Sequence, residues 1–170
     1  MPVRTIVHVG LLTAISVVLT RTLSLMVPIG GAIGLRLSIG EVPIYLAGIL
    51  FGPLAGGVTG AAADLIGVSI AGIDFFPGFT ISALLAGLVP GVLLHRRRDT
   101  LTFRQIVIVI IIAGFMVTAL NTVWVNLLYG QALVVLLPPR ILSRLLMIPI
   151  HSGLVWIVIR RFRMISQSQG

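Results

Sequence analysis

Two carboxylates lie in the middle of a chain that is otherwise almost entirely apolar. Asp64 and Asp74 both belong to the segment "DLIGVSIAGIDFFPGFT", in a sequence that is 58% hydrophobic and only 9% charged. An ionisable side chain in such surroundings is costly to bury, so it faces a partner charge or a polar cavity rather than hydrocarbon. Asp64, which can be placed deep within a predicted helix, is therefore a candidate ligand-binding residue.

Basic and amide side chains could complete such a site. Arg140 and Arg144 are four residues apart, so on a helix they share one face. Guanidinium groups form paired hydrogen bonds with carboxylates. The alternative is that these groups form structural ion pairs or extend to lipid headgroups. The polar candidates besides Asp64 are Arg21, Arg36, Asn121, Asn126, Arg140 and Arg144.

The segment "FFPGFT" predicts an aromatic wall beside these polar groups. Pro77 and Gly78 are typical of a turn, and Thr80 is a typical N-cap for the helix expected to follow. Aromatic rings here could close over a planar ligand. The alternative is a belt of aromatic residues at the membrane interface. The aromatic candidates are Phe75, Phe76, Phe79, Trp124 and Tyr129.

Other chemistries find little support in the sequence. His8, His95 and His151 are too widely separated to predict a metal site. Ser152 adjoins His151, but adjacent residues point to different faces of a helix, so a hydrolytic triad with Asp64 is not predicted. The chain has no cysteine and no phosphate-binding loop. We therefore expect neither catalytic activity nor a cofactor.

The composition predicts a polytopic membrane protein, because the mean hydropathy is +1.17 over 170 residues. A helix needs about 20 apolar residues to cross a hydrocarbon core of about 30 Å, which leaves room for six helices and no separate soluble domain. We expect an all-α fold in which residues 1–170 form one compact bundle of six transmembrane helices, with Pro43 tilting or breaking the short second helix. The expected helices are 4–27, 37–51, 53–70, 77–95, 104–129 and 138–162.

The arginines predict the orientation of this bundle. The chain has twelve arginines and no lysine, and eight of them fall where six helices place them on one side. The positive-inside rule makes that side cytoplasmic, together with both termini. The net charge of +8 therefore needs no nucleic-acid partner. The eight residues are Arg4, Arg96, Arg97, Arg98, Arg104, Arg160, Arg161 and Arg163.

The other four arginines fall on the outer side. At a rise of about 1.5 Å per residue, Arg21 lies about 25 Å above Arg4, and Asp64 lies about 16 Å up the third helix. Arg140 and Arg144 begin the sixth helix, and Asn121 lies similarly high on the fifth. We therefore predict a polar pocket that opens outward.

Small residues predict a close helix contact beside Asp64. Gly52, Gly56 and Gly60 precede this acid at intervals of four residues, and small side chains let helix backbones approach closely in membranes. We expect another helix to pack along this glycine strip, which would fix the position of the acid.

Several of these segments together resemble one known family. They are "LTRTLSLM", "LRLSIGEVPIYLAGILFGPLAGGVTGAAADLIG", "FFPGFTISALLAGLVPG", "NTVWVNLLYG" and "PPRILSRLLMIPI", which cover nearly the whole chain. In their order they are similar to the folate-specific S components of energy-coupling-factor (ECF) transporters.

The resemblance implies a vitamin-binding subunit in the prokaryotic cell membrane, with an outward-facing site and no enzymatic activity. Its partners would be a transmembrane coupling subunit and two ATPase subunits, whose ATP hydrolysis topples the S component so that its site faces the cytoplasm. The family's coupling contact commonly uses Ala-xxx-Ala in the first helix. Gly10 and Ala14 are the nearest match here, with Val18 in place of a further alanine.

Folate also fits the residues themselves. A carboxylate can accept two hydrogen bonds from the amino-pyrimidinone edge of the pterin, aromatic rings can stack on it, and arginines suit the dianionic glutamate tail. We expect Asp64, or otherwise Asp74, to hold the pterin edge and Arg21, Arg140 and Arg144 to hold the glutamate or ring carbonyls. The substrate-binding residues predicted in this way are Arg21, Asp64, Phe76, Phe79, Thr80, Asn121, Trp124, Arg140 and Arg144.

Two other functions remain open at this point. The chain could be an S component for riboflavin, thiamine or a pyrimidine, although a cationic ligand would leave four outer arginines unexplained. It could also be a structural membrane subunit without a ligand, in which the polar groups only hold the bundle together. A ligand that stays bound through purification would argue against the second alternative.

Overall fold

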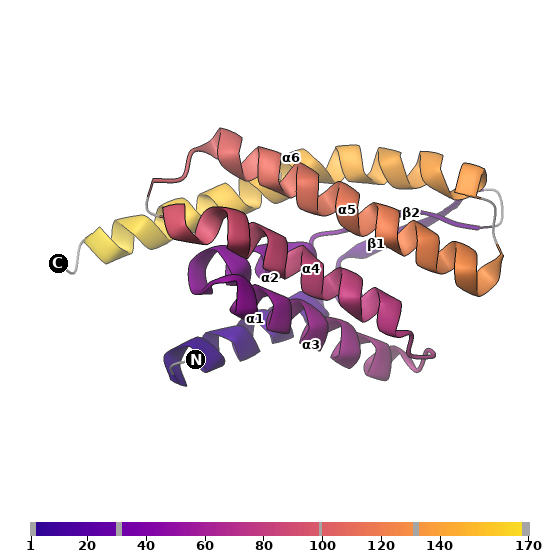
Figure 1. The fold of residues 1–170 in the computed structure, drawn as a ribbon, viewed down its shortest axis with the longest axis horizontal. Helices are drawn as coiled ribbons and strands as arrows, with labels where there is room; N and C mark the ends of the chain where they lie inside the picture. Colours follow the sequence, from indigo (N-terminus) through magenta and orange to yellow (C-terminus); the bar gives the residue numbers. More distant parts are fainter. Residues whose placement is uncertain (1–2, 30–31, 99, 131–132, 168–170) are drawn as a thin grey trace.

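The structure is a computed structural model, and it describes residues 3–29, 32–98, 100–130 and 133–167. The chain forms a bundle of helices with one β-hairpin (Figure 1). The elements in chain order are α1 (Val3–Thr22), β1 (Ser24–Ile29), β2 (Ala32–Ser38), α2 (Glu41–Phe51), α3 (Pro53–Ala71), α4 (Pro77–Leu94), a 3-10 turn (His95–Arg97), α5 (Phe103–Tyr129) and α6 (Leu133–Gln167).

The short helix α2 lies at the centre of the bundle, where it contacts α1, α3, α4 and α6. Around it, α1 packs on α3, α3 on α4, α4 on α5, and α5 on α6. Both ends of the described chain lie at one end of the bundle, and the hairpin lies at the other (Figure 1). The core surrounds α2 and includes the fully buried side chains of Tyr45, Ile49, Ile106, Ile110, Val155 and Ile159.

The six expected helices are present in the described chain, and five of them are long and apolar enough to cross a membrane. The exception is α2, whose 11 residues extend only about 16 Å at 1.5 Å per residue, about half of a hydrocarbon core. Pro43 lies in its first turn, where proline removes no intrahelical hydrogen bond, so the predicted break does not occur there.

The hairpin corrects the expected first and second helices. Instead of extending over 4–27, α1 ends at Thr22, and α2 begins at Glu41 rather than at residue 37. Between them β1 and β2 pair antiparallel, with an irregularity between Val27 and Pro28. Hydropathy alone does not distinguish an apolar strand from an apolar helix. The overlooked signal was Pro28 followed by a glycine-rich segment, because both residue types disfavour a helix interior.

The predicted glycine strip is a helix contact, as expected, and its partner is α4. A Cβ atom added at Gly87 would overlap the carbonyl oxygen of Gly56, and one added at Gly60 would overlap the carbonyl oxygen of Ala83. The two backbones therefore touch because side chains are absent. One turn further along the same contact, Asp64 of α3 meets Thr80 of α4.

Adding one methyl group to this contact tests its importance. We expect Gly87→Ala to lower the free energy of unfolding by about 1–3 kcal/mol, because the α3 and α4 backbones must separate to admit it. The matched control is Gly153→Ala in α6, where a Cβ meets nothing within 4 Å. Thermal unfolding of the detergent-solubilised protein measures both, and equal melting temperatures for the two variants would contradict the expectation.

Candidate ligand-binding site

Asp64 lies on α3 in the part of the α3–α4 contact that is nearer to the connection between these helices. Its Oδ2 atom accepts a hydrogen bond of 2.7 Å from the hydroxyl of Thr80. The expectations that Thr80 is an N-cap and that Pro77 and Gly78 form a turn are wrong, because α4 begins at Pro77. Proline is favourable at a first helical position, where its missing N–H costs nothing. Thr80 therefore lies inside the helix, and its hydroxyl orients the carboxylate.

An aromatic group lies at the start of α4, in the same helical turn as Thr80. The ring of Phe76 lies 5.6 Å from that of Phe79 and 5.8 Å from that of Trp124, both edge to face. The indole Nε1 of Trp124 donates a 3.1 Å hydrogen bond to the hydroxyl of Ser82. Gly78 makes this packing possible, because a Cβ there would lie 2.8 Å from the indole ring.

The aromatic wall is therefore smaller than the sequence suggested. The structure brings together Phe76, which directly precedes α4, Phe79 of α4 and Trp124 of α5. Phe75 and Tyr129 are 53% and 70% exposed, and they do not share in this group.

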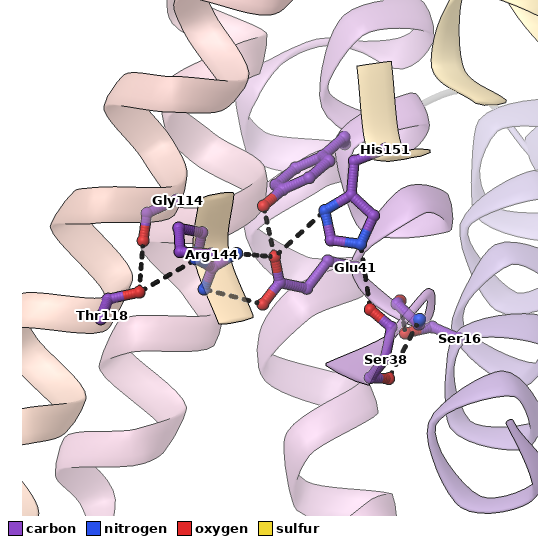
Figure 2. Close-up of polar contacts among 9 residues, drawn as sticks. Ser16, Ser38, Glu41, Gly114, Thr118, Arg144 and His151 are labelled. Carbon is purple, nitrogen blue, oxygen red and sulfur yellow. Dashed lines mark hydrogen bonds and ion pairs between the residues drawn. The ribbon is translucent and has the colours of Figure 1, made fainter. Parts of the chain in front are cut away.

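Arg144 forms an ion pair with Glu41 in the interior of the bundle (Figure 2). Its two terminal nitrogens reach the two carboxylate oxygens at 2.6 and 3.2 Å, and its Nε donates to the hydroxyl of Thr118 at 3.0 Å. The Arg144 side chain is only 12% exposed. Such a paired geometry compensates much of the cost of removing two charges from water.

His151 lies on the other side of the same carboxylate (Figure 2). Its Nε2 lies 2.9 Å from the carbonyl oxygen of Ser38, and because a carbonyl only accepts, this nitrogen carries the proton. Its Nδ1 lies 3.8 Å from Glu41. The hydroxyl of Tyr45 also donates to Glu41. The network thus joins α2, α5 and α6 to the end of β2.

Sequence reasoning missed Glu41, Tyr45 and His151 as members of a polar site. Histidines far apart in sequence gave no reason to expect a cluster, and His151 reaches Glu41 only because α2 and α6 pack together. The available signal was Glu41 itself, which is the sole glutamate of the chain and begins a helix that is otherwise apolar except for Tyr45.

The other predicted polar residues occupy separate places. Arg140 donates from Nη1 to the hydroxyl of Thr122 at 3.0 Å. Arg21, in the last turn of α1, donates to the carbonyl oxygen of Gly67 on α3. The side-chain oxygen of Asn121 is buried and has no hydrogen-bond partner in the described part of the chain. Each predicted arginine except Arg36, whose side chain lies outside the described residues, thus has a distinct neighbour.

An open apolar hollow of about 550 Å³ lies on α6 and is lined by Leu137, Pro138, Ile141, Leu142 and Leu145. It contains none of the predicted site residues, and its lining offers no group for polar recognition. The polar residues above are therefore the stronger candidate site.

The predicted coupling residues lie on an open face of α1. Gly10 and Ala14 are both exposed, and a Cβ at Gly10 would meet nothing within 4 Å. The contact of these residues with a partner stays a prediction.

Comparison with known proteins gives consistent matches over nearly the whole chain. The family model described as "ECF transporter, substrate-specific component" matches residues 4–159. The protein named Folate transporter FolT from Clostridium novyi (strain NT) is 31% identical over 155 residues, which cover 91% of this chain and 87% of the relative. Folate transporter FolT from Leuconostoc mesenteroides is 27% identical over 131 residues, or 74% and 71% of the two chains.

Solved structures share the fold. The crystal structure of FolT bound with folic acid superposes with a TM-score of 0.79 at 25% identity and covers 94% of each chain. The S-component for biotin from an ECF-type ABC transporter gives a TM-score of 0.66 at 22% identity, over 95% of this chain and 92% of that one. The second likeness concerns the fold alone. Together with five helices suited to cross a membrane, these matches identify a multi-pass membrane protein.

The buried ion pair can be tested by a double-mutant cycle. We expect Arg144→Gln alone to lower the free energy of unfolding by about 2 kcal/mol, because it leaves the carboxylate of Glu41, whose side chain is only 28% exposed, without its cation. The variant with both Glu41→Gln and Arg144→Gln should recover part of this loss. Unfolding by denaturant, followed by circular dichroism, measures the cycle, and strictly additive single effects would show that the two residues do not interact.

Proposed function

Because this chain belongs to the substrate-specific components of ECF transporters, we propose that it binds folate in an outward-facing site and delivers it across the membrane. The observation that carries this proposal is the 31% identity to a folate transporter, in a fold shared with a folate-bound relative. The chemistry that folate needs is available among the described residues: the carboxylate of Asp64, the aromatic rings of Phe76, Phe79 and Trp124, and the guanidinium group of Arg140, which forms no ion pair with a described acidic side chain.

In this proposal Asp64 receives the pterin. A carboxylate accepts two parallel hydrogen bonds from the amino-pyrimidinone edge, which other vitamins with different ring edges do not offer. The hydroxyl of Thr80 donates to Oδ2, and Oδ1 accepts no hydrogen bond from the residues that the structure describes. Thr80 therefore acts by orienting the acid that recognises the ring.

The aromatic residues provide the apolar part of the site. Phe76, Phe79 and Trp124 are at the level of Thr80, where their faces or edges can pack on the fused pterin ring or on the benzoyl ring of folate. The buried oxygen of Asn121 lies one helical turn before Trp124 and is a further acceptor for ligand N–H groups. A buried acceptor without a partner is otherwise costly, which supports a role for it in binding.

The glutamate tail of folate requires cations. The predicted candidates are Arg21, Arg140 and Arg144, which all belong to the half of the bundle that carries the hairpin and the α3–α4 connection. In the proposed orientation this half faces outward, and the end with both termini faces the cytoplasm, as the arginine distribution favours.

Delivery across the membrane requires other subunits, because the sequence has no phosphate-binding loop with which to hydrolyse ATP. We infer that residues 1–170 act as one binding domain without catalytic activity. It would associate, in the cell membrane of a prokaryote, with a transmembrane coupling subunit and two ATPases. The exposed face of α1 with Gly10 and Ala14 is the proposed contact for the coupling subunit.

Replacing the proposed pterin acceptor tests the site. We expect Asp64→Asn to raise the folate dissociation constant by roughly tenfold or more, because a charged hydrogen-bond acceptor is lost. Asp74→Asn is the matched control, since Asp74 is exposed after the end of α3. Isothermal titration of the purified protein measures both, and the reverse pattern would assign the pterin to Asp74.

Binding of folate should change the intrinsic tryptophan fluorescence of the protein. Trp124 adjoins Phe76 in the site, whereas Trp156 packs on Phe103 near the other end of the bundle. We expect saturable quenching of intrinsic fluorescence by folate, after correction for its absorbance, and much weaker quenching in Trp124→Phe. Thiamine and riboflavin serve as comparison ligands, and a response to either one in place of folate would refute the proposed substrate.

A further inference from the structure

Two arginines of α6 occupy equivalent positions against α5. Arg144 hydrogen-bonds the hydroxyl of Thr118, and Arg140 hydrogen-bonds the hydroxyl of Thr122, both at 3.0 Å. Each pair of residues is four apart on its own helix, so the two antiparallel helices repeat the same contact one turn further out. We call the Arg144–Thr118 contact the inner rung and the Arg140–Thr122 contact the outer rung.

The threonine hydroxyls of both rungs donate to a backbone carbonyl oxygen four residues earlier in α5. The Thr118 hydroxyl donates to the carbonyl oxygen of Gly114 at 2.8 Å, and the Thr122 hydroxyl donates to the carbonyl oxygen of Thr118 at 2.7 Å. Both hydroxyl protons are therefore used on the backbone, and both oxygens remain acceptors for a guanidinium group. Each threonine thus holds its arginine by the same chemistry.

The rungs differ in the anion that faces the arginine. In the inner rung the carboxylate of Glu41 takes two hydrogen bonds from Arg144. In the outer rung Arg140 is half-buried, yet no acidic side chain of the described residues forms an ion pair with it, and its hydrogen bond to Thr122 is the single one that its side chain makes there. The chain has only four acidic residues, so few could fill this place.

A half-buried guanidinium group with most of its donors unused favours an anion with two oxygens. The geometry points to Arg140 as the residue that binds a carboxylate of the ligand, which would take at Arg140 the place that Glu41 takes at Arg144. This inference rests on the proposed function, and it assigns different roles to Arg140 and Arg144. Arg144 becomes a positioning residue that holds α2 and α6 together, and Arg140 becomes the residue that selects ligands with an anionic tail.

The test compares folate with its dimethyl ester, which keeps the rings and the amide but carries no negative charge on the tail. Both ligands are titrated into the purified full-length protein by calorimetry. We expect wild type to bind folate roughly tenfold or more tightly than the ester, because paired charged hydrogen bonds are lost. In Arg140→Gln the two ligands should bind with dissociation constants within about twofold of each other, because the neutral amide cannot form the charge-assisted pair.

Arg144→Gln is the matched control on the neighbouring rung. It should lower the melting temperature and weaken folate and the ester by the same factor, so that the preference for folate persists. Thr122→Val provides a second variant of the outer rung, for the case that Arg140→Gln does not fold. It removes the acceptor that orients Arg140 and should reduce the preference for folate by a smaller factor.

The other outcomes contradict either the assignment of Arg140 or the proposed function. An unchanged preference for folate in Arg140→Gln, or its loss in Arg144→Gln, overturns the assignment of Arg140. Equal affinity of wild type for folate and for the ester shows that the protein does not bind the tail through its charge, and it also overturns the assignment. Failure of wild type to bind folate at all refutes the proposed function instead.

Discussion

The ion pair between Glu41 and Arg144 connects the central helix α2 to α6 in the interior of the bundle. A charge inside an apolar bundle is tolerated when its partner is fixed, and here the pair is fixed from three sides by Thr118, Tyr45 and the bidentate contact itself. The pair links α2 to α6, and the hydrogen bond from Arg144 to Thr118 links α6 to α5. His151 extends the connection to the carbonyl oxygen of Ser38, so the end of β2 is attached to the same centre. The position of the hairpin therefore depends on a contact made in the core.

A second constraint acts on the other side of α2, and it involves no polar group. α3 and α4 touch through the backbones of Gly56, Gly60 and Gly87, and this close approach continues along both helices to Asp64 and Thr80. The absence of side chains along one part of a helix contact thus decides where a carboxylate lies. The packing of Phe76 on Trp124 also depends on a missing side chain, because the indole fills the space beside Gly78.

Four charged residues at or near these two centres are of two kinds. Glu41 and Arg144 neutralise one another and hold helices together, whereas Asp64 and Arg140 each hydrogen-bond one threonine hydroxyl and have no other side-chain hydrogen bond within the described part of the chain. A ligand that carries both a polar ring edge and an anionic tail complements the second kind. Membership of a family of transporter components gives this division a functional meaning, because a binding subunit must keep polar groups available inside an otherwise apolar bundle.

The sequence by itself determined the class of the molecule, because the number and length of its apolar segments are a property of composition. The boundaries of α3, α4 and α5 follow from glycine, proline and charge at their ends, and they agree with the expectation within one residue. The helix contact along Gly56 and Gly60 was predictable for a similar reason, since a strip of small residues has few uses other than close packing.

Only the tertiary structure decided which residues form ion pairs and hydrogen bonds with one another. No spacing in the sequence relates Glu41 to Arg144, which are 103 residues apart, or His151 to Ser38, which are 113 residues apart. The hairpin likewise depends on the contact of β2 with α6, which local hydropathy does not encode. The sequence supplied the charged residues and their depth. Only the packing of α2 between its neighbours decided that Arg144 has its own carboxylate and Arg140 has none among the described residues, because charges pair by distance in space rather than by distance along the chain.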